Sequence, residues 1–549
     1  MLRNRLTLGK IGRWGRTALI LALIISLPIL ILALSWLQPQ GHIWSHLFST
    51  VLSDYLINSL LLAVGTGAGS LFLGTACAWC IVRYQFPLRS FLQWALLLPM
   101  AMPGYIIAYT YTGILDFSGP VQSFIRDTFS LRYGQYYFPD IQSLPGAILM
   151  LSLVLFPYVY LLGLGAFKAQ STSLYFASRS MGLNHWQYFQ KVALPLARPA
   201  LFTGTALTMM EAFADFGTVQ YFGIPTFTTG IFRVWFGMNS QMAAAQLASC
   251  LCLFVLSLLV WEQLSRRKQR FYQLGQKSQL LAPKRLSKGQ GLLITGLVAT
   301  PFLLGFLVPV WQLIIWSIQT FGQMFNQDFT LLLWNSFRLA MLAAVVVSFV
   351  ALILGYGKRL SNHLTVTAAT QLSGLGYALP GIVIAIGVMI PFAWLDKLLN
   401  QLLNPIFDTR LGLLFSGSLF ALVFAYLVRF LTVAKHSIDA GLERIRPSLD
   451  EASRNLGFSP GQVLRKVHVP LLTGSVLSAV LLVFVDVMKE LPATLILRPF
   501  NFNTLAVKTY ELATDERLAD AALPAISIVA IGLIPIIFLA YSIDKQKGS

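Results

Sequence analysis

Residues 175–196 read YFASRSMGLNHWQYFQKVALPL, and residues 450–471 read DEASRNLGFSPGQVLRKVHVPL. The two segments lie 275 positions apart, and nine of their 22 aligned positions carry the same residue. Ordinary residue usage gives roughly one or two such matches by chance. The chain is therefore an internal duplication, and this segment occupies the same place in each copy.

The composition places both copies in a membrane. Hydrophobic residues make up 56% of the chain and charged residues only 11%. Apolar runs of about 18 residues or more recur, and runs of that length are typical of transmembrane helices. We predict an all-α polytopic membrane protein with about twelve transmembrane helices in two tandem repeats. The predicted spans are 17–37, 59–82, 91–115, 144–167, 199–221, 242–263, 292–317, 336–356, 364–391, 412–432, 474–495 and 521–541.

The formal charge of +19 raises the question of a nucleic-acid partner, which the placement of the basic residues answers. Residues 264–290 carry eight Lys and Arg residues and no acidic residue, whereas 38–57 and 318–334 contain neither Lys nor Arg. This alternation follows the positive-inside rule for membrane proteins and forms no nucleic-acid-binding stripe. We therefore expect a lipid bilayer and no nucleic acid as partner, with both termini and both repeated segments in the cytoplasm.

The duplication defines the expected domains. These are a first half of six helices at 1–263, a basic cytoplasmic linker at 264–290 and a second half of six helices at 291–549. Pro103-Gly104 matches Pro380-Gly381 at an offset of 277, so the likeness extends beyond the repeated segment. Since each half has an even number of spans, the halves have the same orientation and are related by an axis along the membrane normal, which predicts a pathway between them.

The repeated segment predicts a helix, a turn at Gly and a second short helix. Asn184 and Ser459 occupy equivalent positions and are good N-caps. Pro460 follows its cap at the favoured first helical position. Gly182 and Gly457 each permit a sharp turn out of the preceding helix.

Such a short helix would lie across the membrane face and offer side chains to a partner protein. The alternative is an amphipathic helix resting on lipid headgroups. Duplication at matching positions favours docking, because two equivalent helices can engage two equivalent partner subunits. The side chains expected on this surface are Trp186, Tyr188, Phe189, Phe458, Val463 and Leu464.

Four acidic residues in two predicted spans also occupy matching positions. Glu211 and Asp215 are four residues apart, as are Asp486 and Glu490, so each pair lies on one helix face. Ionisable groups in the bilayer are costly and normally face a cavity, a partner or a pathway. As a pathway lining they would favour a cation such as ferric iron, because hard carboxylate oxygens suit a hard cation.

The structural alternative for these carboxylates is also open. Lys489 is placed to neutralise Asp486, and Gly217 and Pro492 suggest helix breaks whose freed amides the carboxylates would satisfy. Pro103 and Pro380, each followed by Gly, are expected to break helices beside the same pathway, because such breaks are tolerated where neighbours or water satisfy the backbone.

The sequence contains no G-x-x-x-x-G-K-[ST] loop. If transport is driven by ATP, the nucleotide and its Mg ion must bind another chain. We expect a transport subunit rather than an enzyme, with no catalytic residue, no cofactor bound by this chain and no certain metal site. Cys77 and Cys80 have C-x-x-C spacing but lack a βαβ context or further ligands, so we expect inert thiols.

The repeated segment resembles the EAA loop in permease subunits of binding-protein-dependent ABC importers. Glu451-Ala452-Ser453, Gly457 and Val469-Pro470 carry the resemblance, which covers the chain as two fused permease halves with loops at 175–197 and 450–472. It implies a bacterial inner-membrane protein whose loops dock two cytoplasmic ATPases, and an extracytoplasmic binding protein that delivers the cargo. The ATPase-coupling residues it implies are Ala177, Arg179, Gly182, Asn184, Trp186, Pro195, Glu451, Ala452, Arg454, Gly457, Ser459 and Pro470. Phe176 stands where the motif has Glu, so unequal ATPase contacts are expected.

A second stretch is similar to the ferric-iron importers of this superfamily. It comprises DVMKELPAT at 486–494, LRPF at 497–500, TLAV at 504–507 and DERL at 515–518. Thiamine and phosphonate permeases look related, so these cargoes are alternatives. From a different class, an ion-coupled secondary transporter would use the same membrane carboxylates and need no ATPase. A structural or receptor-like membrane protein is the third possibility.

Overall fold

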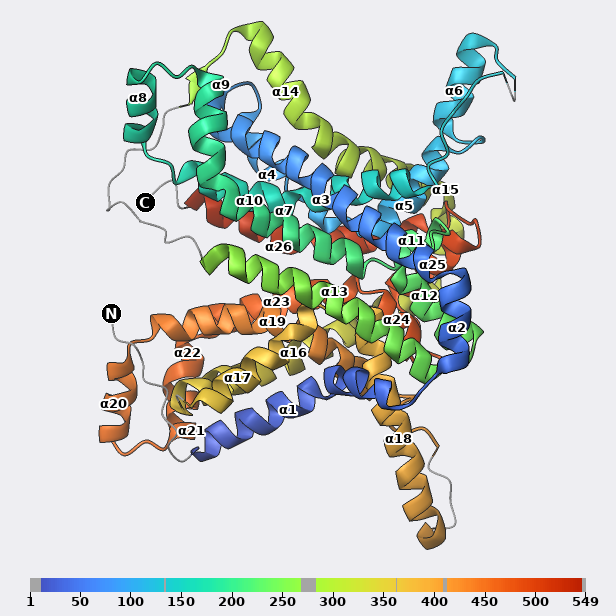
Figure 1. The fold of residues 1–549 in the computed structure, drawn as a ribbon, viewed down its shortest axis with the longest axis vertical. Coiled ribbons are helices and arrows are strands. Elements are labelled where there is room, and N and C mark those ends of the chain that lie inside the picture. The colour runs from blue at the N-terminus through green and yellow to red at the C-terminus, as the bar shows by residue number, and fades with distance from the viewer. Residues whose placement is uncertain (1–10, 133–134, 268–282, 362, 408–411, 546–549) are drawn as a thin grey trace. The chain divides into compact units, whose positions relative to one another are not determined.

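The computed structural model describes residues 11–132, 135–267, 283–361, 363–407 and 412–545. Residues 1–10 and the middle of the predicted linker, 268–282, lie outside the described residues. The described part is built almost entirely of helices, which confirms the all-α class (Figure 1). Two short strands, β1 (Tyr84–Gln85) and β2 (Lys284–Arg285), pair in parallel and attach the end of the linker to the chain after α3.

The first copy and the linker start contain thirteen α-helices among the described residues. They are α1 (Arg13–Leu34), α2 (Gly41–Thr50), α3 (Leu52–Arg83), α4 (Arg89–Ala95), α5 (Gly104–Leu115), α6 (Pro120–Phe129), α7 (Leu144–Lys168), α8 (Thr172–Ser180), α9 (His185–Tyr188), α10 (Leu194–Ala214), α11 (Gly217–Tyr221), α12 (Phe227–Phe232) and α13 (Gln241–Arg267). Those of the second copy are α14 (Lys288–Phe302), α15 (Val308–Met324), α16 (Gln327–Ser361), α17 (Leu364–Leu372), α18 (Gly381–Phe407), α19 (Leu419–Arg444), α20 (Pro447–Asn455), α21 (Pro460–Val463), α22 (Val469–Leu471), α23 (Thr473–Met488), α24 (Pro492–Leu497), α25 (Leu505–Thr514) and α26 (Ala522–Lys545).

Every predicted span coincides with one or more of these helices, but several are not straight rods. Within the described residues, eight helices are long and apolar enough to cross a membrane, and two bent pairs raise the number to ten. The pairs are bent by 95° before Gly104 and by 76° before Thr473. Fewer continuous spans than twelve are counted because the helices expected at 91–115, 199–221 and 474–495 are interrupted, and because only 522–537 of the span expected at 521–541 is counted as an apolar helix.

Equivalent helix triads form the core of each compact unit. In one unit α3, α7 and α10 pack together, and in the other α16, α19 and α23 do so. Gly74 on α3 and Gly204 on α10 both lie against Val159 on α7, where an added Cβ would come within 2.7 Å of that residue. Small residues at these crossings let the backbones approach closely, which is how helices associate where lipid removes the hydrophobic driving force.

The compact units divide the chain differently from the sequence halves. One unit comprises Met1–Trp44, Ile231–Cys252 and Phe325–Lys508, and the other comprises Ser45–Gly230, Leu253–Met324 and Thr509–Ser549. The reason is that α1 packs against α16, α17 and α18, whereas α14 packs against α3 and α4, and α15 packs against α5 and α26. The first helix of each sequence half therefore belongs to the core built by the other half.

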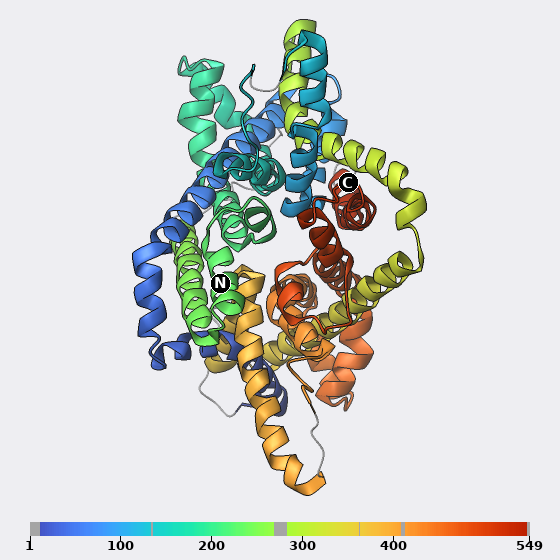
Figure 2. The same ribbon diagram turned by 90° about the vertical axis from the view of Figure 1, so that its right-hand side faces the viewer.

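The two copies also differ after their Pro-Gly pairs. In the first copy the chain leaves the helix at Asp116, between α5 and α6. In the second copy α18 continues unbroken and projects past the other helices of its unit (Figure 2). There the buried carboxylate of Asp396 holds the returning chain by accepting backbone N–H bonds from Phe415 at 2.9 Å and Ser416 at 2.8 Å. The turn that follows α5 therefore has no counterpart at the matching position of α18.

Candidate functional site

The two repeated segments fold in the same way. After α8 and α20, Gly182 and Gly457 take φ values of 82° and 83°, in the left-handed region. The next residue in each segment donates its amide to a carbonyl five residues back, Leu183 to Ser178 and Phe458 to Ser453, both at 3.1 Å. Nothing lies within 4 Å of an added Cβ at either Gly. Glycine is therefore required for the backbone angle rather than for packing, as predicted.

The predicted caps begin the second short helix of each segment. Asn184 Oδ1 accepts the Gln187 amide at 2.8 Å, and Gln187 Oε1 accepts the Asn184 amide at 2.9 Å. In the other segment Gln462 Oε1 accepts the Ser459 amide at 2.8 Å, and Pro460 is the first helical residue. Reciprocal bonds of this kind satisfy amides that have no partner within the helix.

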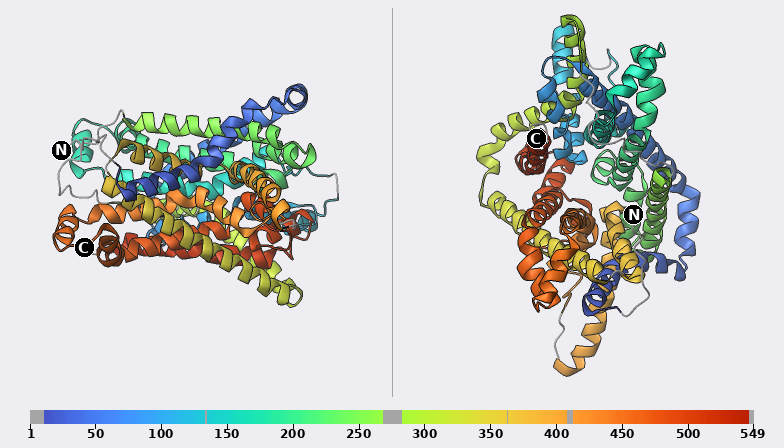
Figure 3. Two further views of the ribbon diagram at one scale, coloured as in Figure 1. Left: turned by 90° about the horizontal axis from the view of Figure 1, so that it is seen from below. Right: turned by 90° about the vertical axis from the view of Figure 1, so that its left-hand side faces the viewer.

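Most of the residues predicted for coupling lie on the exposed surface of these segments. Figure 3 shows α20 and α21, in orange, at one end of the long helices α19 and α23. The exposed ones are Ala177, Arg179, Gly182, Asn184, Trp186, Glu451, Ala452, Arg454, Gly457, Ser459 and Pro470, while Pro195 is half-buried. Two of the side chains expected on the docking surface are buried instead. Tyr188 packs on Tyr175 and Trp79, and Val463 is only 2% exposed. A helix of four residues has only a small outward face, so it cannot expose all of its side chains.

The base of the second segment is held by charges. Arg359, at the end of α16, donates to Asp450 at 2.7 and 3.0 Å and to the carbonyl oxygen of Ile445 at 2.9 Å. The fully buried His468 contacts the other oxygen of Asp450 at 2.5 Å. Burial by itself would raise the pKa of Asp450, but the hydrogen bonds from Arg359 and His468 outweigh it and lower the pKa below its usual value. This ionic clamp fixes α20 to α16.

The base of the first segment is held by aromatic contacts. Tyr175 stands at the position matched to Asp450, and the Arg83 guanidinium lies 4.3 Å from the centre of its ring. The Tyr175 hydroxyl lies 3.1 Å from Nδ1 of His185, and Arg83 Nη2 lies 3.4 Å from the same nitrogen. Burial, followed by the charges of Lys284, Arg83 and Arg179, lowers the pKa of His185. The lowered pKa favours a neutral ring that accepts from both donors.

The first pair of membrane carboxylates lies at a helix break. The chain leaves α10 at Asp215 and enters α11 at Gly217. Asp215 Oδ1 accepts the Val219 amide at 3.1 Å, and Oδ2 accepts the Thr218 hydroxyl at 2.9 Å. Asp215 therefore caps the second fragment of the broken span. Glu211 lies one turn earlier and is half-buried.

The second pair repeats this arrangement with a counter-ion. The buried Glu490 accepts the amides of Ala493 at 2.9 Å and Thr494 at 3.0 Å, so it caps α24. Its Oε1 also lies 3.4 Å from Nη1 of Arg429 on α19. One turn earlier, Asp486 pairs with Lys489 at 2.9 Å, as the structural alternative predicted.

The Pro-Gly pairs meet the same carboxylates. Pro103 is the N-cap of α5, and Gly381 begins α18 directly after Pro380, which confirms both predicted breaks. A Cβ on Gly104 would lie 3.1 Å from Oδ2 of Asp215, and one on Gly381 would lie 2.6 Å from Oε1 of Glu490. Two helix starts therefore converge on one carboxylate in each unit, where their positive dipole ends favour its charge.

Sequence reasoning identified both capping carboxylates but missed Arg429, Arg359 and His468. Arg429 carries the one charge in the predicted span 412–432, and such a residue is expected to have a partner inside the protein. This lone charge in an apolar span suggests a buried ion pair of Arg429, but it does not identify Glu490 as the partner. The geometry of Asp215 and Glu490 agrees with the structural alternative, and the pathway role of the four carboxylates remains a prediction.

A family model described as binding-protein-dependent transport system inner membrane component matches residues 70–270 and 350–546. The chain belongs to this family. Because the model matches once in each copy, it confirms the interpretation of the duplication as two fused permease halves.

The relatives of this inner membrane component differ in how much of the chain they match. Fe(3+)-transport system permease protein FbpB 2 of Haemophilus influenzae is 27% identical over 503 residues, which are 90% of this chain and 90% of the relative. Ferric transport system permease protein FbpB of Actinobacillus pleuropneumoniae is 23% identical over 474 residues, 80% of this chain and 64% of the relative. Molybdenum transport system permease protein ModB of Escherichia coli is 26% identical over 204 residues, 36% of this chain and 86% of the relative.

Replacing three of the membrane carboxylates should lower the free energy of unfolding by different amounts, the largest for Glu490 and the smallest for Asp486. Glu490→Ala leaves two amides and Arg429 unpaired in a buried site and should lower the free energy of unfolding by about 3–5 kcal/mol. Asp215→Ala leaves one amide and one hydroxyl without their acceptor but strands no arginine, and should lower it by about 1–2 kcal/mol. Asp486→Ala breaks a partly exposed ion pair worth less than about 1 kcal/mol. Unfolding of the three purified variants in mixed micelles measures the order, and an Asp486→Ala loss equal to that of Glu490→Ala would contradict it.

Acidification should loosen the first segment before the second. Because the folded state lowers the pKa of His185, the fold loses stability as the pH falls below the usual value of 6.5. The lowered pKa of Asp450 keeps its contribution intact until the pH falls below 3.8. Hydrogen exchange, corrected for intrinsic rates, should therefore rise in 172–188 between pH 7 and 5 but not in 447–463.

The variant His185→Gln is the control for this pH effect. Glutamine cannot be protonated in this range, so exchange in 172–188 should become independent of pH. Identical pH profiles in the two segments would show that their different clamps have no energetic consequence.

Proposed function

We propose that this chain is the permease subunit of an ATP-driven importer that moves ferric iron, delivered by an extracytoplasmic binding protein, into the cytoplasm. The observation that carries the proposal is the extent of the matches. The relatives named for ferric iron match 80% to 90% of this chain, through both copies. Relatives named for molybdenum or sulfate match only 30% to 39% of it.

The distribution of charge supports one orientation in a bacterial inner membrane. The loops at 38–57 and 318–334 contain no Lys or Arg, whereas the linker at 264–290 contains eight. Basic loops face the cytoplasm. Both termini and both repeated segments then lie in the cytoplasm, and the turn after α5 lies on the outer side.

Two separate ATPases, which bind ATP and Mg themselves, are proposed to dock on the repeated segments. The sequence offers no phosphate-binding loop of its own. The first segment presents Phe176, Met181 and Trp186, which are 61%, 74% and 62% exposed. Exposed apolar side chains grouped on one segment are typical of a binding surface. The second segment presents the exposed Glu451 at the position of Phe176, so the two contacts differ in chemistry.

For the pathway, we assign different tasks to the four membrane carboxylates. Asp215 and Glu490 hold the broken helices through backbone amides, which supports a positioning role. Glu211 and Asp486, one turn earlier at matching positions, are the proposed lining for a cationic cargo. The exposure of the Asp486 side chain, 22%, is consistent with access from a water-filled path.

Disturbing the glycine turns should release the ATPases without unfolding the membrane helices. Gly182→Ala with Gly457→Ala forces two side chains into the left-handed region, at about 1–2 kcal/mol each. We expect reduced co-purification of the ATPase and a midpoint of thermal unfolding lowered by only a few degrees. Gly165→Ala with Gly474→Ala is the matched control, because both glycines have open space around them and ordinary helical angles. Full ATPase retention in the first double variant would remove the docking assignment.

Uptake into vesicles tests the cargo and the energy source together. Vesicles containing this chain, its ATPase and its binding protein should take up radiolabelled ferric iron only with ATP, and an excess of thiamine, a phosphonate or molybdate should not compete. Glu211→Gln with Asp486→Asn should slow uptake while ATPase co-purification persists. Uptake driven by an ion gradient without ATP would instead favour a secondary transporter, and ATP-dependent uptake of a competitor would change the cargo alone.

A further inference from the structure

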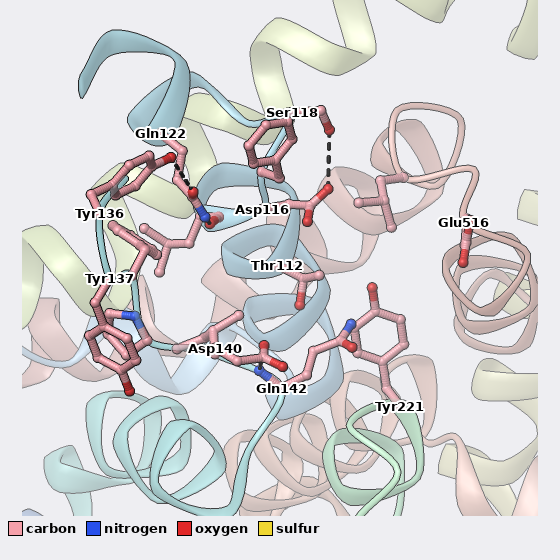
Figure 4. Close-up of a pocket in the computed structure, with 16 residues that line it drawn as sticks. Thr112, Asp116, Ser118, Gln122, Tyr136, Tyr137, Asp140, Gln142, Tyr221 and Glu516 are labelled. Atoms are coloured by element: carbon pink, nitrogen blue, oxygen red, sulfur yellow. Dashed lines mark hydrogen bonds between the residues drawn. The ribbon is translucent and has the colours of Figure 1, made fainter. Parts of the chain in front are cut away.

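A cavity of about 880 Å³ lies where the chain turns after α5. Its walls come from the end of α5, from the two arms of a hairpin at 116–122 and 136–142, from Tyr221 at the end of α11 and from the turn at 516–518 (Figure 4). We call it the hairpin pocket. It belongs to one compact unit, and in the orientation proposed above it opens on the side where cargo arrives.

The lining of the hairpin pocket is rich in oxygen donors. It contains three carboxylates, those of Asp116, Asp140 and Glu516, and none of its sixteen lining residues is Lys, Arg or His. The formal charge of the lining is therefore −3, in a chain whose formal charge is +19. Arg126 is not a lining residue, but it donates to the carbonyl oxygen of Phe117 at 2.7 Å and to the Tyr136 hydroxyl at 3.3 Å, so one positive charge lies beside the pocket. Three carboxylates against this one guanidinium favour a cation over an anion as ligand.

Uncharged side chains with oxygen atoms complete the lining, and they come from α5, α11 and the hairpin. The Tyr221 phenol lies next to Thr112 of α5 and Gln142 of the hairpin, with Asp116 and Glu516 within electrostatic range (Figure 4). Tyr136 donates to Gln122 at 2.7 Å, which ties the two arms of the hairpin together. Phenol, amide and carboxylate oxygens are hard ligands, the kind that hard metal cations prefer.

Glu516 occupies a position that ordinarily favours glycine. It follows α25 with a φ of 60°, and the next residue, Arg517, donates its amide back to the carbonyl oxygen of Leu512 at 2.9 Å. Glycine is the usual residue at this place in a helix end. An acidic side chain held there, and turned into a pocket, indicates a use for that side chain.

The size of the pocket specifies the form of its ligand. Among the described residues no three His, Cys, Asp or Glu side chains are grouped closely enough to hold a metal ion directly. A bare ion would also leave most of the 880 Å³ empty, since a water molecule occupies only about 30 Å³ of liquid. A cation that retains water or a small chelator fits both observations.

We propose that the hairpin pocket is an acceptor site for a hard, multiply charged metal cation that still carries water or a small chelator. The proposal rests on the proposed transport of iron and places this pocket between release from the binding protein and entry into the membrane. Position 393, which matches Asp116 at the 277 offset, is Ala393 within the unbroken α18. Asp116 therefore has no acidic counterpart at the matching position of the second copy.

Equilibrium binding to the assembled transporter tests the pocket without transport. Radiolabelled ferric nitrilotriacetate is titrated onto the chain with its ATPases in nanodiscs, without binding protein or nucleotide. Asp116→Asn, Asp140→Asn and Glu516→Gln together should weaken binding by about tenfold or more, because they remove the whole charge of the lining. Asp127→Asn is the control: it removes an exposed charge from the same hairpin outside the pocket, and it should change binding by less than about twofold.

Two further arms identify the ligand and guard against misfolding. Displacement by hydrated La³⁺ would show that the pocket takes the hydrated ion, and its absence would show that the chelator is part of the ligand. The double variant Asp140→Asn with Glu516→Gln leaves Asp116, which ends α5 and accepts from Ser118, in place. It should weaken binding by several-fold even if the triple variant fails to assemble. Molybdate binding that these variants abolish would overturn the assignment to cations.

The outcomes separate this inference from the proposed function. Normal ferric binding and uptake in the triple variant would overturn the acceptor site and leave the cargo standing. Ferric binding that depends on the pocket, in a wild-type chain that takes up no iron, would support the acceptor site and overturn the cargo.

Discussion

A helix that breaks inside a membrane must find partners for the backbone amides that the break exposes, because lipid supplies none. In this protein two carboxylates meet that requirement, Asp215 at the start of α11 and Glu490 at the start of α24. Each also lies against a second helix start, at Gly104 or Gly381. Each unit therefore has the same structural arrangement, in which a Pro-Gly pair and a broken span meet at one carboxylate. The positive ends of the two helix starts in each unit favour a negative charge on its carboxylate.

The duplication has kept this geometry while changing the chemistry around it. Glu490 has Arg429 beside it, whereas the first copy has Val154 at the position matched to Arg429. The repeated segments turn at glycines with nearly the same φ, but one is fixed by an ionic clamp on Asp450 and the other by the stacking of Arg83 on Tyr175. Backbone geometry is shared because it depends on a few residue types at fixed spacing. Side-chain partners diverge more easily, since several kinds of contact can hold the same turn.

This divergence gives the two halves of a pseudosymmetric permease different properties. The first copy builds most of the hairpin pocket, to which the second copy adds Glu516, and it holds its repeated segment through Tyr175 and His185. The second copy has the unbroken α18 and the ionic clamp on Asp450. Fusion of the halves in one chain allows such specialisation, because each half is always paired with the other.

The sequence alone determined the class, the duplication and the local turns. Apolar runs specify helices, and the identical spacing of Gly182 and Gly457 and of their caps specifies the same turn twice, because these features depend only on neighbours along the chain. The capping role of Glu490 was also accessible, since Pro492 marks the break. Only the tertiary structure decided that Arg429 and Arg359 are the partners of Glu490 and Asp450, that Tyr188 and Val463 are buried, and that α1 and α14 belong to the cores of the opposite copies. Most of these facts depend on contacts between segments separated by 61 to more than 300 positions, and periodicity and spacing carry no information about such contacts.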